Sequence, residues 1–372
     1  MQGNEIIYQI FVRNYSEDGS FESVRKHLKR IKDLGVDVIY LTPIHPISVL
    51  KRKGKVGSPY AIQDYFEIDK SYGSKEDFTR LINDVHKQGM KIIIDMVFNH
   101  TGRDNVLLKS HPEYYFYRSG KLGNRVGDWS DIIDLDTSRD DTKEYLLSVL
   151  KYWRGLGVDG FRFDVASMIP LDFFQKARKE LGNDVFFLAE SIDYNFANYL
   201  RSTGDNPTRD EEMFPTFDVL YNYSWYRELE SYLTNQSSID ELVYALNKDA
   251  QLLQDRGLRL NCLENHDTER IASRVSRETL FNLIDFIFYL KGMTFIYMGQ
   301  EYGNTHRPNL FEKDPVIWDK DEEIYEHYLK AINAKKKQPS EIFQKFVKVN
   351  NNTIKVKTYL KDKLLEEREF KL

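Results

Sequence analysis

Eight short runs of β-branched and aromatic residues, found between residues 6 and 298, constrain the fold of this chain more than any other feature. Most of these runs are continuously apolar and do not alternate between apolar and polar residues. Strands of that composition are buried on both faces, as in a parallel sheet covered by helices. The runs span residues 6–12, 36–41, 91–98, 158–165, 185–189, 216–221, 258–263 and 293–298.

Helical patterns fill the intervals between these runs. Within residues 21–34, for example, apolar residues recur at the spacing of one helix face. Eight strands that alternate with helices predict an α/β fold, a (β/α)8 TIM barrel. A doubly wound open sheet is the structural alternative. The other clear helical patterns span residues 74–88, 142–154, 171–181 and 322–337.

The spacing of the predicted strands indicates how the chain is divided. We assign residues 1–337 to the catalytic barrel, and within it residues 101–135, which have little periodicity, to a small insertion after the third strand. Residues 338–372 alternate weakly and contain a hairpin-type turn at 350–352. This C-terminal β region is too short for an independent two-sheet domain. It is either a rudimentary domain that packs on the barrel or part of a truncated one.

Composition argues against several classes of protein. The 53 Lys and Arg residues are outnumbered by 58 Asp and Glu residues, whereas a nucleic-acid-binding protein would carry a basic surface. No apolar run reaches the roughly 18 residues of a membrane span. The single cysteine, Cys262, excludes an internal disulfide and a multi-cysteine zinc site. Because the N-terminal residues lack the pattern of a signal peptide, we expect a cytoplasmic location. The sequence indicates no oligomeric state.

Polar and charged residues follow several of the apolar runs. In a TIM barrel the loops after the strands build the active site, so these side chains are expected to meet at one end of the barrel. A single carboxylate there could be a helix cap or a solvated loop charge. Four strands that end this way favour a functional site, since buried charges are costly unless they are paired. The residues are Asn99 with His100, Arg162 with Asp164, Glu190, and the segment 264–267.

Carboxylates beside an arginine suit cleavage of a glycosidic bond. One carboxylic acid must protonate the leaving oxygen, and another carboxylate must attack the sugar or position water. Arg162 and Asp164 are two residues apart, so both point to the same face of a strand. The guanidinium is expected to lower the pKa of Asp164 and keep it anionic. Glu190 follows an apolar run, which is expected to raise its pKa, as a general acid requires.

Four motifs resemble those of the α-amylase family of glycoside hydrolases, which are TIM barrels that act on α-glucosidic bonds. They occur in the family's order, on the predicted third, fourth, fifth and seventh strands. Any one motif would be a weak signal, but the four together are specific. The motifs are Asp95-Met-Val-Phe-Asn99-His100, Gly160-Phe161-Arg162-Phe163-Asp164, Phe187-Leu-Ala-Glu190 and Asn265-His266-Asp267.

This resemblance implies the catalytic residues. Asp164 would be the nucleophile and Glu190 the general acid and base. Asp267 would hold two hydroxyls of the sugar and strain its ring. With the two carboxyl groups about 5–5.5 Å apart, the reaction would pass through a covalent glycosyl-enzyme and retain the α configuration.

The resemblance also implies substrate-binding residues. Arg162 would orient and ionise Asp164, and His100 and His266 would bind hydroxyls of the sugar at the cleavage point. Tyr60, in the segment Gly57-Ser58-Pro59-Tyr60, would stack on the apolar face of that sugar. Alternatives stay open, since both histidines could be satisfied core residues and Tyr60 could be ordinary loop packing.

Two features depart from the family pattern. Many members bind calcium, often with an asparagine at the place of Asn99, but residues 101–135 show no clear cluster of oxygen ligands. We therefore expect no required cofactor, and Asn99 is a weak candidate ligand for calcium. Many α-amylases also have Lys-His shortly after the nucleophile, where this chain has Ser167-Met168. The motif therefore leaves the leaving-group side of the cleft undefined.

The sequence predicts a retaining glycosidase that cleaves α-glucosidic bonds, with α-1,4 bonds favoured, in malto-oligosaccharides or in starch- and glycogen-like glucans. A transglycosylase, such as a glucanotransferase or a sugar-isomerising synthase, is the alternative on the same site. A non-catalytic sugar-binding homologue is disfavoured because all three carboxylates are present, although a fold alone does not imply a function. A metal-dependent hydrolase using His100, His266 and Asp267 has no supporting ligand spacing.

Overall fold

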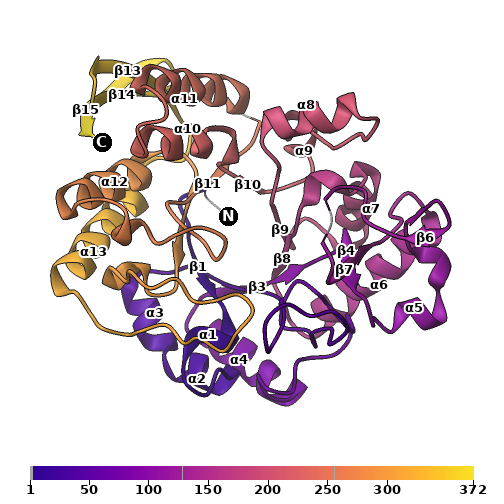
Figure 1. Ribbon diagram of the computed structural model, residues 1–372. Coiled ribbons are helices and arrows are strands. Elements are labelled where there is room, and N and C mark those ends of the chain that lie inside the picture. Colours follow the sequence, from indigo (N-terminus) through magenta and orange to yellow (C-terminus); the bar gives the residue numbers. More distant parts are fainter. Residues whose placement is uncertain (1–2, 128, 255) are drawn as a thin grey trace.

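Eight parallel strands close into a barrel at the centre of the molecule (Figure 1). The first and last strands of the barrel pair with each other, which closes the ring. The predicted TIM barrel is therefore confirmed, and the doubly wound sheet is excluded. The computed structural model describes residues 3–127, 129–254 and 256–372, so residues 1, 2, 128 and 255 of the predicted barrel region lie outside it. The barrel strands are β1 (Ile6–Ile10), β2 (Val38–Leu41), β3 (Lys91–Met96), β8 (Gly160–Phe163), β9 (Phe186–Ala189), β10 (Val219–Tyr221), β11 (Arg259–Asn261) and β12 (Met293–Tyr297).

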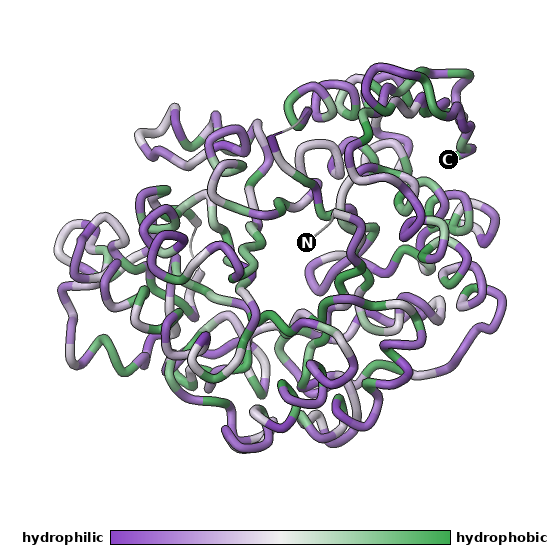
Figure 2. Tube along the Cα trace, turned by 180° about the vertical axis from the view of Figure 1, so that it is seen from behind, coloured by the Kyte–Doolittle hydropathy of each residue, from purple (hydrophilic) through white to green (hydrophobic). Residues whose placement is uncertain are grey.

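Each barrel strand is shorter than its apolar run. Val97 and Phe98, for example, are fully buried but lie beyond the end of β3. Apolar side chains continue to pack at the barrel end after the hydrogen-bonded ladder has stopped, so hydrophobicity overestimates strand length. Hydrophobic segments run along the central strands, whereas the outer helices alternate between hydrophobic and hydrophilic residues (Figure 2).

Helices surround the barrel and connect consecutive strands. The pattern over residues 21–34 forms two helices, because the chain leaves helical geometry at His27. No helix in the described part of the chain is long and apolar enough to cross a membrane. The longer helices are α2 (Phe21–Lys26), α3 (Leu28–Leu34), α4 (Lys75–Lys87), α6 (Asp140–Gly155), α7 (Leu171–Leu181), α8 (Tyr194–Ser202), α10 (Tyr223–Leu233), α11 (Ile239–Leu253), α12 (Arg277–Tyr289) and α13 (Glu322–Lys337). The short ones are α1 (Val12–Tyr15), α9 (Asp210–Met213), η2 (Ala166–Met168), η3 (Ile271–Ser273) and η4 (Gln300–Tyr302).

The insertion after β3 has more regular structure than its sequence indicates. The strand β4 (His100–Gly102) pairs antiparallel with β7 (Ile132–Asp134) and so ties the two ends of the insertion together. These partners are far apart in sequence, so no local pattern announces the pairing. The rest of the insertion contains α5 (Leu107–Ser110), η1 (Pro112–Tyr114) and the small hairpin of β5 (Tyr117–Arg118) with β6 (Lys121–Leu122).

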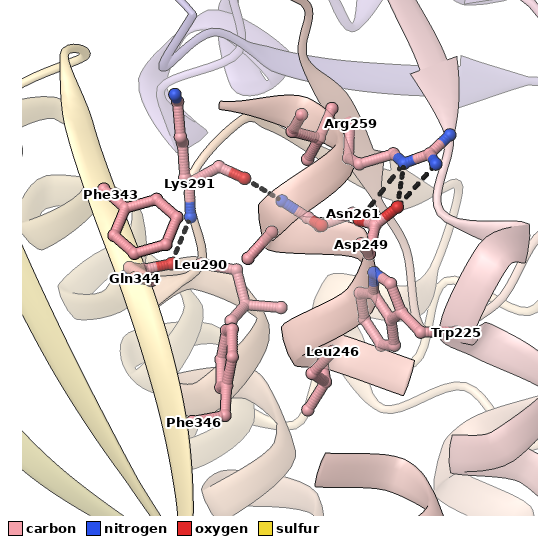
Figure 3. A pocket seen from close by; sticks show the side chains of 12 residues that line it. Trp225, Leu246, Asp249, Arg259, Asn261, Leu290, Lys291, Phe343, Gln344 and Phe346 are labelled. Carbon is pink, nitrogen blue, oxygen red and sulfur yellow. Dashed lines mark hydrogen bonds and ion pairs between the residues drawn. The ribbon is translucent and has the colours of Figure 1, made fainter. Parts of the chain in front are cut away.

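The C-terminal residues form a three-stranded antiparallel sheet that packs on the barrel helices. Its strands are β13 (Ile342–Asn350), β14 (Thr353–Leu360) and β15 (Lys363–Lys371), and the turn between the first two lies where the sequence predicts a hairpin. Asn247 on α11 holds β13 by bonding both the N–H and the carbonyl of Phe346 at 3.0 and 2.7 Å. Beside it, Gln344 accepts a hydrogen bond from the backbone of Lys291, and a small cavity of about 40 Å³ lies between β13 and the neighbouring helices (Figure 3).

Candidate active site

Two carboxylates stand at the carboxyl ends of adjacent barrel strands. Asp164 directly follows β8, and Glu190 directly follows β9. The last residues of these strands, Phe163 and Ala189, are partners in the parallel ladder. The sequence-predicted carboxylates are therefore brought side by side by strand register.

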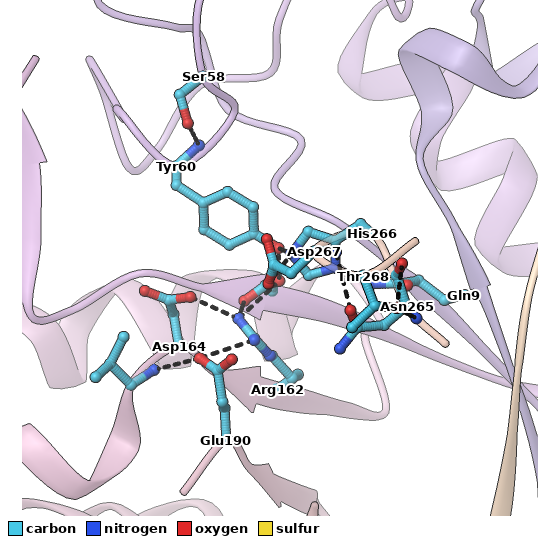
Figure 4. A network of polar contacts seen from close by, with 12 residues as sticks. Gln9, Ser58, Tyr60, Arg162, Asp164, Glu190, Asn265, His266, Asp267 and Thr268 are labelled. Atoms are coloured by element: carbon cyan, nitrogen blue, oxygen red, sulfur yellow. Dashed lines mark hydrogen bonds and ion pairs between the residues drawn. The ribbon is translucent and has the colours of Figure 1, made fainter. Parts of the chain in front are cut away.

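A buried arginine connects three carboxylates of the site (Figure 4). The Nη1 of Arg162 donates to both oxygens of Asp95, at 2.9 and 3.1 Å, and to Oδ1 of Asp164 at 2.8 Å. Its Nη2 forms an ion pair with Oε2 of Glu190 at 2.9 Å. Because Arg162 is fully buried, one guanidinium supports three carboxylates in a region largely shielded from water.

Asp95 supports Arg162 from the neighbouring strand. It lies on β3, where it pairs with Arg162 in the ladder, and it is completely buried. The hydroxyls of Tyr40 and Tyr60 donate to its Oδ2 at 2.5 and 3.0 Å. These contacts agree with the structural role that its place inside an apolar strand suggests, and they fix the guanidinium between Asp164 and Glu190.

Burial dominates the electrostatics of Asp164, the predicted nucleophile. It raises the pKa of Asp164 well above its ordinary value, and the nearby charges of Glu190 and Asp95 raise it further. Arg162 lowers the pKa of Asp164, as the sequence predicts, but it is shared among three carboxylates and does not offset the other effects. Three carboxylates thus share one guanidinium, and the pKa of Asp164 stays above its ordinary value.

Strained backbone holds Glu190 in place. Val165 has φ of 43° and ψ of 44°, a left-handed conformation that is rare for a β-branched residue. In this conformation its N–H donates to Oε2 of Glu190 at 2.8 Å. Strain of this kind persists only where surrounding contacts impose it, and it is concentrated at functional sites.

A second group of side chains contacts Asp95 through the hydroxyl of Tyr60. Its other members are His266 and Asp267. The ring of Tyr60 stacks on that of His266 with centroids 5.1 Å apart, and its hydroxyl lies 2.6 Å from Nε2 of His266. The same nitrogen is 3.1 Å from Oδ2 of Asp267, while Gln9 contacts Nδ1 at 2.8 Å. Both ring nitrogens of His266 thus have protein partners, and its binding of a sugar hydroxyl stays a prediction.

Asp267 is the most accessible of the three predicted catalytic carboxylates. Its side chain is 49% exposed, compared with 9% for Asp164 and 13% for Glu190. Partial burial would raise the pKa of Asp267, but the charge and hydrogen bond of His266, helped by Arg162 and Arg307, lower it to about 2. Asp267 is therefore a half-exposed anionic acceptor beside His266.

His100 reaches the site from the insertion. It is the first residue of β4, and the amide of Asn99 lies 3.3 Å from its Nδ1. Burial lowers the pKa of His100 to about 4, against an opposing effect of Asp131, so its ring is neutral near pH 7. The rings of His100 and Trp129 lie 6.5 Å apart between centroids, and Trp129 is 43% exposed. Trp129 is thus an aromatic residue near the site that the sequence motifs did not identify.

Sequence reasoning also missed two polar residues of the site. Gln9 fixes His266 from inside β1, and Arg307 donates to the backbone carbonyl of Asp267 at 2.8 Å. A glutamine within an apolar strand was a usable signal for the first. Arg307 lies in a loop far along the chain, and no sequence pattern identified it as a site residue.

In the described part of the chain, the side chains of the candidate site are not arranged to hold a metal ion. Among residues 3–127, 129–254 and 256–372, no group of three or more His, Cys, Asp or Glu side chains is arranged to hold one. The amide of Asn99 contacts His100, and its backbone carbonyl accepts from Leu135 at 3.0 Å. The independence from calcium stays a prediction.

Known families and structures match most of the chain. A family model described as the catalytic domain of alpha amylase matches residues 9–352. The crystal structure of an alpha-amylase from Lactobacillus plantarum is 37% identical, with a TM-score of 0.92, and the match covers 96% of this chain and 86% of that one. A noncanonic maltogenic alpha-amylase, AmyB, from Thermotoga neapolitana is 33% identical, with a TM-score of 0.85 over 95% and 83% of the two chains.

This chain matches only part of the length of a curated relative. The maltogenic alpha-amylase of Bacillus acidopullulyticus is 29% identical over 349 residues, which cover 86% of this chain but 56% of that protein. The chain spans about half the length of the curated relatives that it matches first. The predicted resemblance is confirmed: this chain belongs to the alpha-amylase family and spans its catalytic domain.

Proposed function

We propose that this chain is a retaining hydrolase of α-glucans, which cleaves α-1,4 bonds in malto-oligosaccharides and in starch- or glycogen-like chains. The observation that carries the proposal is that Asp164 and Glu190, which follow adjacent strands, both pair with the guanidinium of Arg162. Relatives named maltogenic alpha-amylase and cyclomaltodextrinase support the α-glucan substrate. An intracellular maltogenic amylase of Bacillus subtilis among the relatives supports a cytoplasmic location.

The first step forms a covalent intermediate. Glu190 gives its proton to the glycosidic oxygen, the bond from that oxygen to the anomeric carbon breaks, and Asp164 forms a bond to the carbon. Oδ1 of Asp164 is held by Arg162, whereas Oδ2 has no hydrogen-bond donor in the described part of the chain and is available to attack. In this step Glu190 supplies the proton and Asp164 the attacking oxygen, and Arg162 contacts both side chains.

The second step releases the sugar. Glu190, now ionised, takes a proton from a water molecule, and the oxygen of that water attacks the anomeric carbon and displaces Asp164. Two inversions retain the α configuration. Asp267 accepts hydrogen bonds from sugar hydroxyls throughout, and neutral His100 donates one.

Reducing-sugar release from maltopentaose tests the acid role. Glu190→Gln is expected to lower kcat at least about 100-fold, since it removes the general acid. Glu326→Gln, the same change at an exposed position on α13, is the matched control. Equal activity of the wild type and E190Q would contradict the assignment.

Proton NMR of the earliest product tests the stereochemistry. The α-anomer should appear first and then mutarotate, whereas an initial β-anomer would exclude the covalent route through Asp164. Chromatography of the same reaction separates hydrolysis from transfer, because products longer than the substrate would favour the transglycosylase alternative.

A further inference from the structure

Gln9 is a polar residue in the apolar wall of the barrel. It lies in β1, where the parallel ladders place it between Tyr40 of β2 and Tyr297 of β12, and it is completely buried. In the described part of the chain its side chain forms one hydrogen bond, with Nδ1 of His266 at 2.8 Å, and its Oε1 has no partner (Figure 4). Burying an amide with one group unpaired is costly, so stability alone does not explain a glutamine at this position.

The other side of the His266 ring determines where a proton must lie. Its Nε2 is 3.1 Å from Oδ2 of Asp267 and 2.6 Å from the hydroxyl oxygen of Tyr60. An ionised carboxylate only accepts hydrogen bonds, so a proton on Nε2 makes the contact with Asp267 attractive. A lone pair on Nε2 would instead face a lone pair of the carboxylate. The contact with Asp267 therefore requires a proton on Nε2 of His266.

Gln9 determines the state of the second ring nitrogen. A neutral imidazole that is protonated at Nε2 has an acceptor at Nδ1. The amide nitrogen of Gln9 faces this Nδ1 and donates to it. A proton on Nδ1 would place two donors against each other. Gln9 thus stabilises the tautomer of His266 that Asp267 needs, from the opposite side of the ring.

The position of this proton affects two further hydrogen bonds. The hydroxyl of Tyr60 accepts from His266 and donates its own proton to Oδ2 of Asp95 at 3.0 Å. The donors in the series Gln9, His266, Tyr60 and Asp95 therefore all point in the same direction. With the opposite tautomer, Tyr60 would have to donate to His266, and Asp95 would lose that bond.

We propose that Gln9 is a positioning residue, which holds His266 in the tautomer protonated at Nε2 and through it orients Asp267 and Tyr60 for hydrolysis. The inference rests on the proposed function. It adds to the site a buried residue that acts through His266, and this residue lies outside the four sequence motifs.

NMR of the histidine side chains tests the position of the proton. In protein labelled with 15N-histidine, long-range 1H–15N spectra show which ring nitrogens carry protons, and His266→Asn identifies the signal of His266 among the eight histidines. At about pH 8, where an ordinary histidine is neutral, we expect a proton on Nε2 alone in the wild type. In Gln9→Glu we expect a proton on Nδ1, because the new carboxylate only accepts. A wild-type ring protonated at Nδ1, or identical His266 signals in the wild type and Q9E, would overturn the proposal.

Steady-state kinetics on maltopentaose test whether this contact matters for the reaction. Gln9→Met keeps the volume of the side chain but removes the donor, and kcat/KM is expected to fall about tenfold, the usual effect of losing one buried hydrogen bond. Gln344→Met is the matched control, because Gln344 is a buried glutamine that bonds Tyr289 and Lys291 beside the C-terminal sheet. Q344M should leave kcat/KM unchanged, even where it lowers stability. An unchanged kcat/KM in Q9M would contradict the positioning role.

The outcomes separate this inference from the proposed function. The spectra of the wild type and of Q9E, a variant close in shape to the wild type, decide the proton position whether or not the protein hydrolyses maltopentaose. Spectra that overturn the role of Gln9 would leave the hydrolase assignment in place. A wild-type protein that is inactive on maltopentaose would instead overturn the hydrolase assignment, and with it the link between Gln9 and catalysis.

Discussion

Arg162 is the residue whose removal has the most calculable consequence. It is fully buried, and its two terminal nitrogens contact Asp95, Asp164 and Glu190 at 2.8 to 3.1 Å. Arg162→Met keeps most of the side-chain volume but leaves three carboxylates without a cation. At least two of them would then have to bind protons or draw water into the barrel end.

The expected loss of stability follows from the burial of the group. Removing one partner of a buried ion pair costs about 3–5 kcal/mol, because an uncompensated charge is left behind. For a chain of 372 residues the entropy of unfolding makes 1 kcal/mol worth roughly 1.3 °C. We expect R162M to lower Tm by about 4–6 °C near pH 8.

The loss of stability in R162M should depend on pH. Arg162 lowers the pKa of Asp164, so that pKa, already raised by burial, rises further in the variant. A carboxyl group whose pKa is raised in the folded state contributes stability at low pH, and this contribution is lost as the pH rises through the folded pKa. The Tm deficit of R162M should therefore be smaller near pH 5 than near pH 8.

Thermal unfolding followed by circular dichroism at several pH values measures this effect. Arg80→Met is the matched control, because the side chain of Arg80 is 61% exposed on α4 and its loss should change Tm little at any pH. A Tm change for R162M below about 1 °C, or one that is equal near pH 5 and pH 8, would refute the argument that Arg162 compensates buried charge.

Three further substitutions probe the other shifted groups. Asp267→Asn is expected to lower kcat/KM at least about 100-fold. It should change the free energy of unfolding by less than about 1 kcal/mol, because the side chain is half exposed. Steady-state kinetics and thermal unfolding measure these two effects, and a stability loss as large as that of R162M would contradict the prediction. The pKa of His100 is lowered to about 4 by burial, so stability should fall as the pH drops from about 6.5 towards 4. H100N should make that slope shallower in urea unfolding without abolishing it, because burial also lowers the pKa of His45 to about 4. Burial lowers the pKa of Lys335 to about 7, so stability should rise as the pH rises from about 7 to 10.5; K335M should flatten this rise, whereas K336M should leave it intact.

Local patterns account for most of the fold. All eight barrel strands and the helices α4, α6, α7 and α13 lie where hydrophobic periodicity places them, because burial of apolar faces selects secondary structure over short stretches of chain. Strand ends and the division of residues 21–34 into two helices were missed. They depend on where hydrogen bonds stop, and the apolar pattern does not record that.

Pairings between distant segments required the tertiary structure. The β4–β7 ladder that makes His100 part of the insertion joins residues separated by a long loop, and the docking of the C-terminal sheet on Asn247 does the same. No periodicity in one segment specifies its partner in another. Sequence spacing could therefore locate these segments but not describe their structure.

The sequence by itself determined which side chains stand at the strand ends, because a barrel strand sends successive residues to alternate faces and Asp164 and Glu190 follow two such strands. Only the tertiary structure decided the direction in which the pKa of Asp164 is shifted. Arg162 was expected to keep Asp164 ionised, but it is shared with Asp95 and Glu190 in a buried cluster, and the pKa of Asp164 rises. The difference has a simple cause: a pKa depends on every charge and on the water within several ångströms, and most of those neighbours are distant in the chain.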